Sequence, residues 1–438
     1  MNQAQKHVII IGGGFGGISV AKQLRGKNIK VTLIDKSNHH LFQPLLYQVA
    51  AAALSPGDIA TPIRRIVGKN SNINVLLGEV VSISSKESKI YLLDGREIAY
   101  DNLVIAVGAR YNYFGHDSWS EYAPGLKSVS DALKIRERIL LSLEEAEQME
   151  DREARKPHLT YVLIGGGPTG VEMAGAIAEI TKKDIQSDYR NISPKDSRIV
   201  LIEASNGILN GYPKPLPEKA KKMLKKMGIE IILGKPVTDI EKGKVFYEGG
   251  EIESYNIIWA AGIVANPIVK MLDAELDRNN RVIVKEDLSL PKHENIYVIG
   301  DAAHTKNKQG QVLPSIAPVA TQQGQFVGKL LAGRYTKGKD VFKYKDKGSM
   351  ATIGKAKAVA DIRGFKFSGF TAWMLWSVIH ILYLIDFRNR FHVFIEWIWY
   401  YFAGKRGVRL ITDRSSCEHC SIKDPQDKES VNVQGVKK

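Results

Sequence analysis

Short apolar runs followed by glycine-rich turns organise the first half of the chain. Residues 8–11 form one apolar run, and residues 159–164 form another. Runs of this length are typical of central parallel strands that are covered on both faces. Each run ends in glycines spaced as G-x-G-x-x-G, and an apolar helical pattern follows each turn. The pattern predicts two strand–turn–helix units of the kind that binds dinucleotides.

The three glycines of such a turn have different roles. Gly12 allows the tight turn, Gly14 lets the backbone approach a pyrophosphate, and Gly17 lets the helix pack closely on the strand. The second turn repeats the spacing at Gly165, Gly167 and Gly170. The N-terminus of the helix then faces the phosphates. Two such turns predict two dinucleotides, one carrying the nicotinamide and the other a tightly held flavin.

An acidic residue follows each glycine turn, at the end of the next β-rich run. Asp35 ends the β-rich run 31–34, at about the ~20-residue interval expected for the carboxylate that binds a ribose hydroxyl. Glu203 ends the run 198–203 after a longer interval, which contains the polar insert 181–197. Residues 204–206 contain no Arg or Lys that could receive a 2′-phosphate, so we expect NADH in preference to NADPH.

Further apolar runs extend this pattern. We predict β-rich segments over residues 73–83, 89–93 and 100–108, a strand end over 257–265 that returns the chain to the first domain, and helices over 129–155 and 314–332. The stretch 129–155 is interpreted as a solvated surface helix. Residues 295–303 predict a strand with Gly300 and Asp301 at a following helix start, where a Gly-Asp pair holds the ribityl chain and pyrophosphate of FAD.

Aromatic residues mark the C-terminal part. Four of the six tryptophans lie within residues 365–402, namely Trp373, Trp376, Trp397 and Trp399. The apolar stretches 372–385 and 391–402 are each shorter than the ~18–20 residues that would span a bilayer. The basic residues nearby are Arg388, Arg390, Lys405, Arg406 and Arg409, which can meet anionic lipid. This region predicts a hairpin on a membrane surface, and a buried hairpin or dimer interface is the alternative.

Charge and cysteine content narrow the function. The 438 residues carry a net charge of +15, which favours an anionic partner, and no nucleic-acid motif accompanies it. The two cysteines, Cys417 and Cys420, exclude a disulfide-stapled fold and a cysteine-ligated iron–sulfur cluster, and we interpret them as reduced thiols without a metal. Residues 38–59, where disulfide-using flavoenzymes carry redox cysteines, contain none, and His39 and His40 there are interpreted as loop residues without a catalytic role.

Taken together, the motifs resemble the type II NADH:quinone oxidoreductases, the single-subunit, non-proton-pumping NADH dehydrogenases among the two-dinucleotide-binding-domain flavoproteins. The resemblance extends from Val8 to about Thr412. The motifs that carry it are GGGFGG, HHLFQPLLYQVA with LSPGDI, VIAVGARYNYFGHDSW, GGGPTGVEMAG, VIGDAA and FRNR followed by RGVRLIT.

The resemblance implies a set of site residues. FAD would be held noncovalently by the first glycine turn and Asp301, and NADH by the second turn, with Glu172 near the flavin. We also assign Phe15, Gln48 and Gly108 to the FAD site, and Gly262 to the NADH site. The family's quinone motif A-Q-x-A-x-Q-x-G maps onto residues 317–324, where Gln322 matches the second glutamine and Pro318 replaces the first. Glu172 and Gln322 are therefore the expected catalytic residues, which would hydrogen-bond or deliver protons to the quinone oxygens. A homodimer is implied by the family alone.

We therefore expect an α/β fold with two Rossmann-like, glutathione-reductase-like dinucleotide-binding domains and a C-terminal amphipathic helical region that anchors to a membrane. The expected divisions are 1–118 and 266–335 for FAD, 119–265 for NADH, 336–420 for the membrane, and a flexible tail over 421–438. The expected activity is NADH oxidation with reduction of a membrane quinone. It would take place at the cytoplasmic face of a bacterial-type plasma membrane, since no signal or transit segment is recognised.

Three alternatives remain at this point. A sulfide:quinone oxidoreductase shares the fold but needs cysteines near the flavin. A soluble NADH-dependent reductase of a protein acceptor would not need the aromatic, basic C-terminal part. A flavin- and NADH-binding sensor protein would not turn over with quinone.

Overall fold

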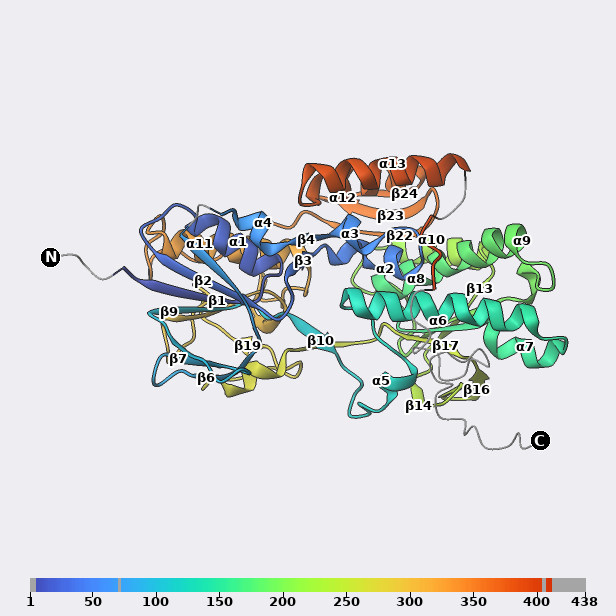
Figure 1. Cartoon of the computed structure of the whole chain (residues 1–438), viewed down its shortest axis with the longest axis horizontal. Helices are drawn as coiled ribbons and strands as arrows, with labels where there is room; N and C mark the ends of the chain where they lie inside the picture. The colour runs from blue at the N-terminus through green and yellow to red at the C-terminus, as the bar shows by residue number, and fades with distance from the viewer. Residues whose placement is uncertain (1–4, 70–71, 404–406, 412–438) are drawn as a thin grey trace, which may run out of the picture. The chain divides into compact units, whose positions relative to one another are not determined.

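The computed structural model describes residues 5–69, 72–403 and 407–411. They form two compact units, each built from segments distant in sequence (Figure 1). The first unit contains residues 1–42, 60–112 and 262–347, and the second contains residues 43–59, 113–261 and 348–438. The segment 43–59 thus belongs to the second unit, and so does the C-terminal part from residue 348. Cys417, Cys420 and the tail 421–438 lie outside the described residues.

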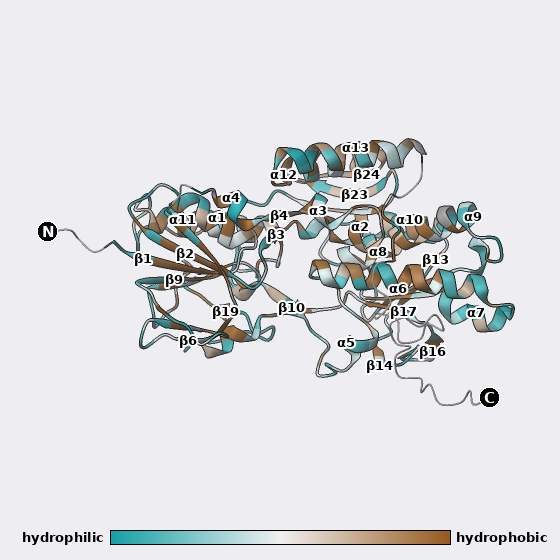
Figure 2. Cartoon of the chain, viewed as in Figure 1, coloured by the Kyte–Doolittle hydropathy of each residue, from teal (hydrophilic) through white to brown (hydrophobic). Residues whose placement is uncertain are grey.

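A five-stranded parallel sheet forms the centre of the first unit, in the order β5-β2-β1-β9-β20. The strands are β1 His7–Ile11, β2 Lys30–Asp35, β5 Ile73–Leu77, β9 Asn102–Ile105 and β20 Ile296–Val298. The first strand is central, and the chain adds strands outward on both sides, as in doubly wound dinucleotide-binding folds. These strands are predominantly hydrophobic (brown in Figure 2), as a sheet covered on both faces requires.

Alternate side chains of β1 enter two different cores. Val8 and Ile10 pack with helices α1 (Phe15–Leu24) and α11 (Ala317–Leu331), whereas Ile9 and Ile11 pack on the other face. Smaller sheets complete this unit: β6 Val80–Ser84, β7 Lys89–Leu92 and β8 Glu97–Ala99; β3 His39–Leu41 and β4 Ala60–Pro62; β10 Ala109–Tyr111 and β18 Ile263–Ala265; β19 Val282–Ile283 and β21 Ala303–His304. Short helices α4 (Ile63–Val67) and η4 (Pro267–Met271) connect them.

The second unit repeats the strand order of the first. Its parallel sheet runs β13-β12-β11-β17, with β11 Thr160–Ile164, β12 Arg198–Glu203, β13 Ile229–Leu233 and β17 Asn256–Trp259. Helix α8 (Pro168–Glu179) follows the second glycine turn and continues into a π-helix, η2 (Ile180–Asp184). The other elements are η1 Gln43–Leu45, α2 Leu46–Ala50, α3 Pro56–Ile59, α5 Trp119–Tyr122, α9 Ile185–Asp188, η3 Pro194–Asp196, α10 Leu216–Lys226, and the antiparallel β14 Val237–Glu241, β15 Lys244–Tyr247 and β16 Gly250–Glu253.

Three predicted elements differ from the observed ones. The helix expected over 129–155 is two helices, α6 (Val129–Gln148) and α7 (Arg152–Leu159), and Asp151 caps the second one. The expectation of a solvated surface helix is wrong for α6, because more than half of it is buried where it packs against α2, α7 and β17. The segment 73–83 is two strands, and Gly300 and Asp301 lie in a 3₁₀ turn, η5 (Gly300–Ala302), that leads into β21 rather than into a helix.

The C-terminal part combines a sheet with two helices. Strands β22 (Ser349–Gly354), β23 (Lys357–Ile362) and β24 (Phe365–Gly369) form an antiparallel sheet that the sequence analysis missed. Helix α12 (Phe370–Tyr383) packs on β23 and β24, and α13 (Phe387–Ala403) lies beside α12 (Figure 1). Within the ranges that the structure describes, every helix is too short or too polar to cross a bilayer.

Candidate functional site

The first glycine turn has the backbone that a dinucleotide cradle needs. Gly12 has φ +103°, and a Cβ there would lie 2.4 Å from the Ala106 carbonyl oxygen. A Cβ at Gly17 would lie 1.8 Å from the carbonyl oxygen of Gly12, so both positions exclude any side chain. A Cβ at Gly14 would instead meet no atom within 4 Å. The space beside Gly14 is therefore open at the N-terminus of α1, which fits a bound pyrophosphate.

Gly13 is held between an acid and a histidine. Its N–H donates to Asp35 Oδ2 at 2.5 Å, while its carbonyl oxygen lies 3.0 Å from His40 Nδ1. Burial lowers the pKa of His40 to about 4, so the ring is neutral and its Nδ1 carries the proton that the carbonyl accepts. Phe15 packs edge-on against the His40 ring at 4.9 Å. His40 and Phe15 thus support the shape of the turn, and Asp35 stands beside it.

A buried glutamine that the sequence analysis did not single out holds the Gly300 turn. Gln323 on α11 accepts a hydrogen bond from the Gly300 N–H at 2.6 Å and donates to Thr305 Oγ1 at 3.0 Å. Asp301 follows Gly300 and is partly buried. Gly108, with φ +70°, ends the β9 segment and has open space where a Cβ would point. The predicted FAD residues 12–17, 35, 108 and 300–301 all lie in the first unit.

The second cradle repeats the first in detail. Gly165 has φ +114°, and a Cβ at Gly170 would lie 1.9 Å from the Gly165 carbonyl oxygen. Open space lies beside Gly167, as it does beside Gly14. Glu203 accepts the Gly166 N–H at 2.5 Å and also the N–H and hydroxyl of Ser205. These residues belong to the second unit, whereas the predicted NADH residue Gly262 begins the last segment of the first unit.

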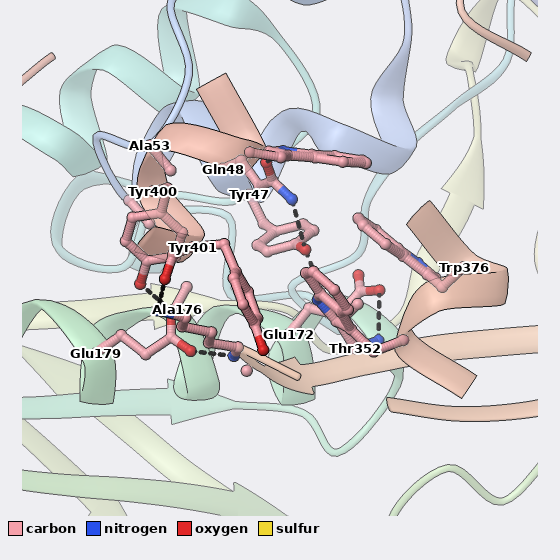
Figure 3. A pocket seen from close by; sticks show the side chains of 15 residues that line it. Tyr47, Gln48, Ala53, Glu172, Ala176, Glu179, Thr352, Trp376, Tyr400 and Tyr401 are labelled. Atoms are coloured by element: carbon pink, nitrogen blue, oxygen red, sulfur yellow. Dashed lines mark hydrogen bonds between the residues drawn. The ribbon is translucent and has the colours of Figure 1, made fainter. Parts of the chain in front are cut away.

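A pocket lined by aromatic rings lies in the second unit, around Glu172 (Figure 3). The pocket is partly open to solvent. Its walls come from α2, α8, the end of β22, α12 and α13, and include Tyr47, Gln48, Glu172, Glu179, Thr352, Lys355, Trp373, Trp376, Trp397, Tyr400 and Tyr401. An aromatic, concave site with a few polar groups is the kind that binds a flat organic ligand.

Glu172 is the acidic group in this pocket with a strongly altered pKa. Burial raises its pKa to about 8, against a smaller lowering effect of the hydrogen bond that its Oε1 accepts from the Thr352 N–H at 3.3 Å. The side chain is therefore mostly a neutral carboxylic acid at pH 7, able to donate a hydrogen bond or a proton. Glu172 lies just after the first turn of α8 and lines the pocket, so it is not a simple surface acid that complements the helix dipole.

A chain of hydrogen bonds connects α13 with β22 across the pocket (Figure 3). Trp397 Nε1 donates to Gln48 Oε1 at 2.8 Å, and Gln48 Nε2 donates to the Tyr47 hydroxyl at 3.0 Å. The Tyr47 hydroxyl in turn lies 2.9 Å from Thr352 Oγ1. Gln48, assigned from sequence to FAD, thus lies in the pocket that contains Glu172, and its side-chain oxygen and nitrogen both bond to pocket residues.

Gln322, the candidate from the quinone motif, has a different environment. Its Nε2 donates to the Lys345 carbonyl at 3.0 Å, and its Oε1 accepts the Lys345 N–H at 2.9 Å. Both bonds lie within the first unit, and they tie α11 to the segment that leaves this unit. The structure therefore gives Gln322 a structural contact, and its role toward a quinone stays a prediction.

Several pocket residues escaped the sequence analysis. Tyr47 lies one position before Gln48, and Glu179 lies seven positions after Glu172 on the same apolar helix. The spacing of two acids by two helical turns was a usable signal for Glu179. Thr352 and Lys355 lie in and after an unpredicted strand, so nothing in the local sequence connected them with Glu172.

Comparisons with known proteins agree with this architecture. Residues 6–324 match the family described as "Pyridine nucleotide-disulphide oxidoreductase", and residues 347–406 match the "NDH2 C-terminal domain". The "Type II NADH:quinone oxidoreductase Ndh" of Mycobacterium tuberculosis is 39% identical over 421 residues, covering 93% of this chain and 91% of the relative.

Two solved structures illustrate the shared fold. NDH2 from Plasmodium falciparum in complex with NADH has a TM-score of 0.85 at 23% identity, covering 93% of this chain and 100% of that one. The sulfide:quinone oxidoreductase of Aquifex aeolicus has a TM-score of 0.69 at 20% identity, covering 91% and 95%. On the sequence match across both parts of the chain, the protein belongs to the pyridine nucleotide-disulphide oxidoreductase family and, within it, to the type II NADH:quinone oxidoreductases.

Proposed function

We propose that this protein is a flavoenzyme that oxidises NADH and reduces a membrane quinone without pumping protons. Membership of the family and the name of the mycobacterial relative support this activity. The structural observation on which this proposal rests is that the carboxyl group of Glu172 lines an aromatic pocket of the second unit, where burial raises its pKa.

The two cradles are proposed to bind the two dinucleotides. FAD would be held noncovalently in the first unit by the turn 12–17, Asp35, Gly108 and the turn 300–301. When bound, it would accept a hydride from NADH and donate two electrons to a quinone. NADH would lie on the turn 165–170, with Glu203 toward its ribose. The space beside Gly14 and Gly167 supports both assignments, since a Cβ built at either glycine would meet no atom within 4 Å. Phe15 would support the FAD turn through its packing on His40.

The pocket around Glu172 is proposed to receive the quinone ring. Trp376 and Trp397 contact each other with ring centroids 5.2 Å apart and ring planes tilted by 32°, and both supply apolar walls. Glu172 would donate a hydrogen bond, and then a proton, to a quinone oxygen. The aromatic walls lower the polarity around the acid and so favour its neutral form until a substrate oxygen accepts its proton.

Helices α12 and α13 are proposed to attach the enzyme to a membrane surface. Both present exposed hydrophobic side chains at helical spacing, namely Phe370, Met374, Val378 and Leu382 on α12, and Phe387, Phe391, Phe394, Ile395, Ile398 and Phe402 on α13. Such a large exposed apolar area is typical of a membrane or protein contact. Arg388 is exposed beside it and suits anionic headgroups. This supports peripheral binding, which we place at the cytoplasmic face.

Rapid-mixing kinetics test the activity. We expect NADH to bleach the bound flavin, and a short-chain quinone to restore its colour, with turnover enhanced by anionic vesicles. Reduction by NADH without quinone-dependent reoxidation would instead favour a protein-acceptor reductase or a sensor. Sedimentation equilibrium tests the proposed homodimer, and a monomer at working concentration would contradict it.

A further inference from the structure

A second carboxylic acid lines the pocket of Glu172. Glu179 lies seven residues further along α8, so both side chains leave the helix on the same side, about 10 Å apart along its axis. Both line the pocket, which is partly open to solvent. The proposed proton transfer from Glu172 to a quinone oxygen does not involve Glu179.

Glu179 is held by groups from two other elements. Its Oε1 accepts the backbone N–H of Lys355, and its Oε2 accepts the Tyr400 hydroxyl at 2.6 Å. Both carboxyl oxygens of Glu179 therefore accept a hydrogen bond from a neighbouring element. The ammonium of Lys355 lies 4.7 Å from the ring centroid of Tyr401, which also lines the pocket. The helix changes to π geometry directly after Glu179, as helices often do at functional sites.

Tyr47 lines the same pocket as the two acids. Burial first, and then the charges of Glu172 and Glu179, raise the pKa of Tyr47 above its ordinary value, so its hydroxyl keeps its proton. A hydroxyl can both donate and accept, and this one also contacts Thr352 Oγ1 at 2.9 Å. The other titratable groups facing the two acids are Tyr212, whose pKa Glu172 raises, and Lys355, Tyr400 and Tyr401.

The proposed reaction needs a proton from solvent. NADH, a quinone and one proton give NAD⁺ and the quinol, and both electrons come from NADH. When the O–H bond of Glu172 breaks and a new O–H bond forms on the quinone oxygen, Glu172 is left as a buried carboxylate. It must recover a proton before the next turnover, and a quinone ring in the pocket covers it.

We propose that Glu179 is the proton-entry residue of this pocket, which passes protons from solvent through water and the Tyr47 hydroxyl to Glu172. The proposal rests on the proposed quinone reduction. Glu179 acts through Glu172 and does not itself touch the quinone.

The test compares Glu179→Gln with Glu147→Gln in the full-length, flavin-loaded enzyme. Glu147 also accepts hydrogen bonds from backbone N–H groups, those of Asn191 and Ile192, but lies outside the pocket, so it is the matched control. For Glu179→Gln we expect reoxidation by quinone to slow about tenfold, with a larger solvent deuterium isotope effect and a shifted pH profile. Flavin reduction by NADH should be unchanged, and the control should behave like the wild type.

Two results would overturn the proposal. One is a Glu179→Gln enzyme with the reoxidation rate and pH profile of the wild type. The other is a change confined to the KM for quinone, which indicates a structural role. If Glu179→Gln does not fold, the test uses Glu179→Asp, which keeps the carboxyl group and should retain the pH profile. Its quinone-induced infrared difference spectrum should show a carboxyl band shifted from that of the wild type. An unshifted band would refute the role of Glu179. A wild type that does not reduce quinone contradicts the proposed function instead.

Discussion

Replacing Glu172 by glutamine tests the chemistry assigned to the pocket. The substitution keeps the size of the side chain and its acceptor oxygen for the Thr352 N–H, but it removes the transferable proton. With a pKa of about 8, the carboxyl is protonated in about nine of ten molecules at pH 7 and in about one of ten at pH 9. Wild-type reoxidation by quinone should therefore fall with a midpoint near pH 8, and Glu172→Gln should lose this step and about 10²-fold in rate.

The raised pKa of Glu172 also makes the free energy of unfolding depend on pH. Its ordinary pKa is 4.5 and its pKa in the folded protein is about 8, which corresponds to at most about 5 kcal/mol at 1.36 kcal/mol per pH unit. The unfolded chain loses the proton first, so the wild type loses stability relative to Glu172→Gln as pH rises from 4.5 to 8. Water that reaches the carboxyl through the pocket reduces this amount.

Two measurements check the reasoning. Rapid-mixing reoxidation with a short-chain quinone from pH 6 to 10 gives the kinetic midpoint, and melting curves at pH 5 and pH 9 give the relative stability. The variant should melt higher than the wild type at pH 9 and near it at pH 5. A variant that retains the reoxidation step near pH 8 would show that another group titrates, and equal melting differences at both pH values would contradict a raised pKa.

Three further predictions concern other parts of the chain. Gln323→Leu leaves the Gly300 N–H without its buried acceptor and should lower the free energy of unfolding by about 1–3 kcal/mol, measured by melting. It should also weaken FAD retention, measured by flavin fluorescence, and undiminished retention would contradict this prediction. Glu203→Ala should raise the KM for NADH without changing flavin content, and an unchanged KM would remove Glu203 from the site. Leu382→Glu with Phe391→Glu should abolish flotation with anionic vesicles while NADH oxidation with ferricyanide persists; unchanged flotation would refute the membrane face.

The cradles were predictable because glycine geometry is a local property. The strand, the positive φ at Gly12 and Gly165, and the acids Asp35 and Glu203 all follow from residues close together in sequence. The roles of these residues toward the nucleotides stay predictions. The buried face of α6 was not predictable in the same way, because it depends on α2, which lies about 80 residues earlier and packs against it.

The pocket could not be predicted from the sequence, because contacts between residues far apart in the chain form it. Thr352 lies in β22 and Lys355 follows it, and this short strand was not predicted from the sequence. Trp397 was assigned to a membrane surface from its composition, yet its indole N–H bonds to Gln48, almost 350 residues away. Gln48 was assigned to FAD from its motif, and only the fold brings it to Glu172.

Helix α8 carries the second glycine turn at its start and both acids of the pocket along one side. Each residue turns an α-helix by 100°, so a single deletion between Gly170 and Glu172 would leave the glycine spacing intact but rotate both acids away from the pocket. Such a lesion would spare nucleotide binding and abolish the chemistry of the pocket. The length of this helix, more than the identity of most of its side chains, therefore limits which insertions and deletions natural variation can tolerate here.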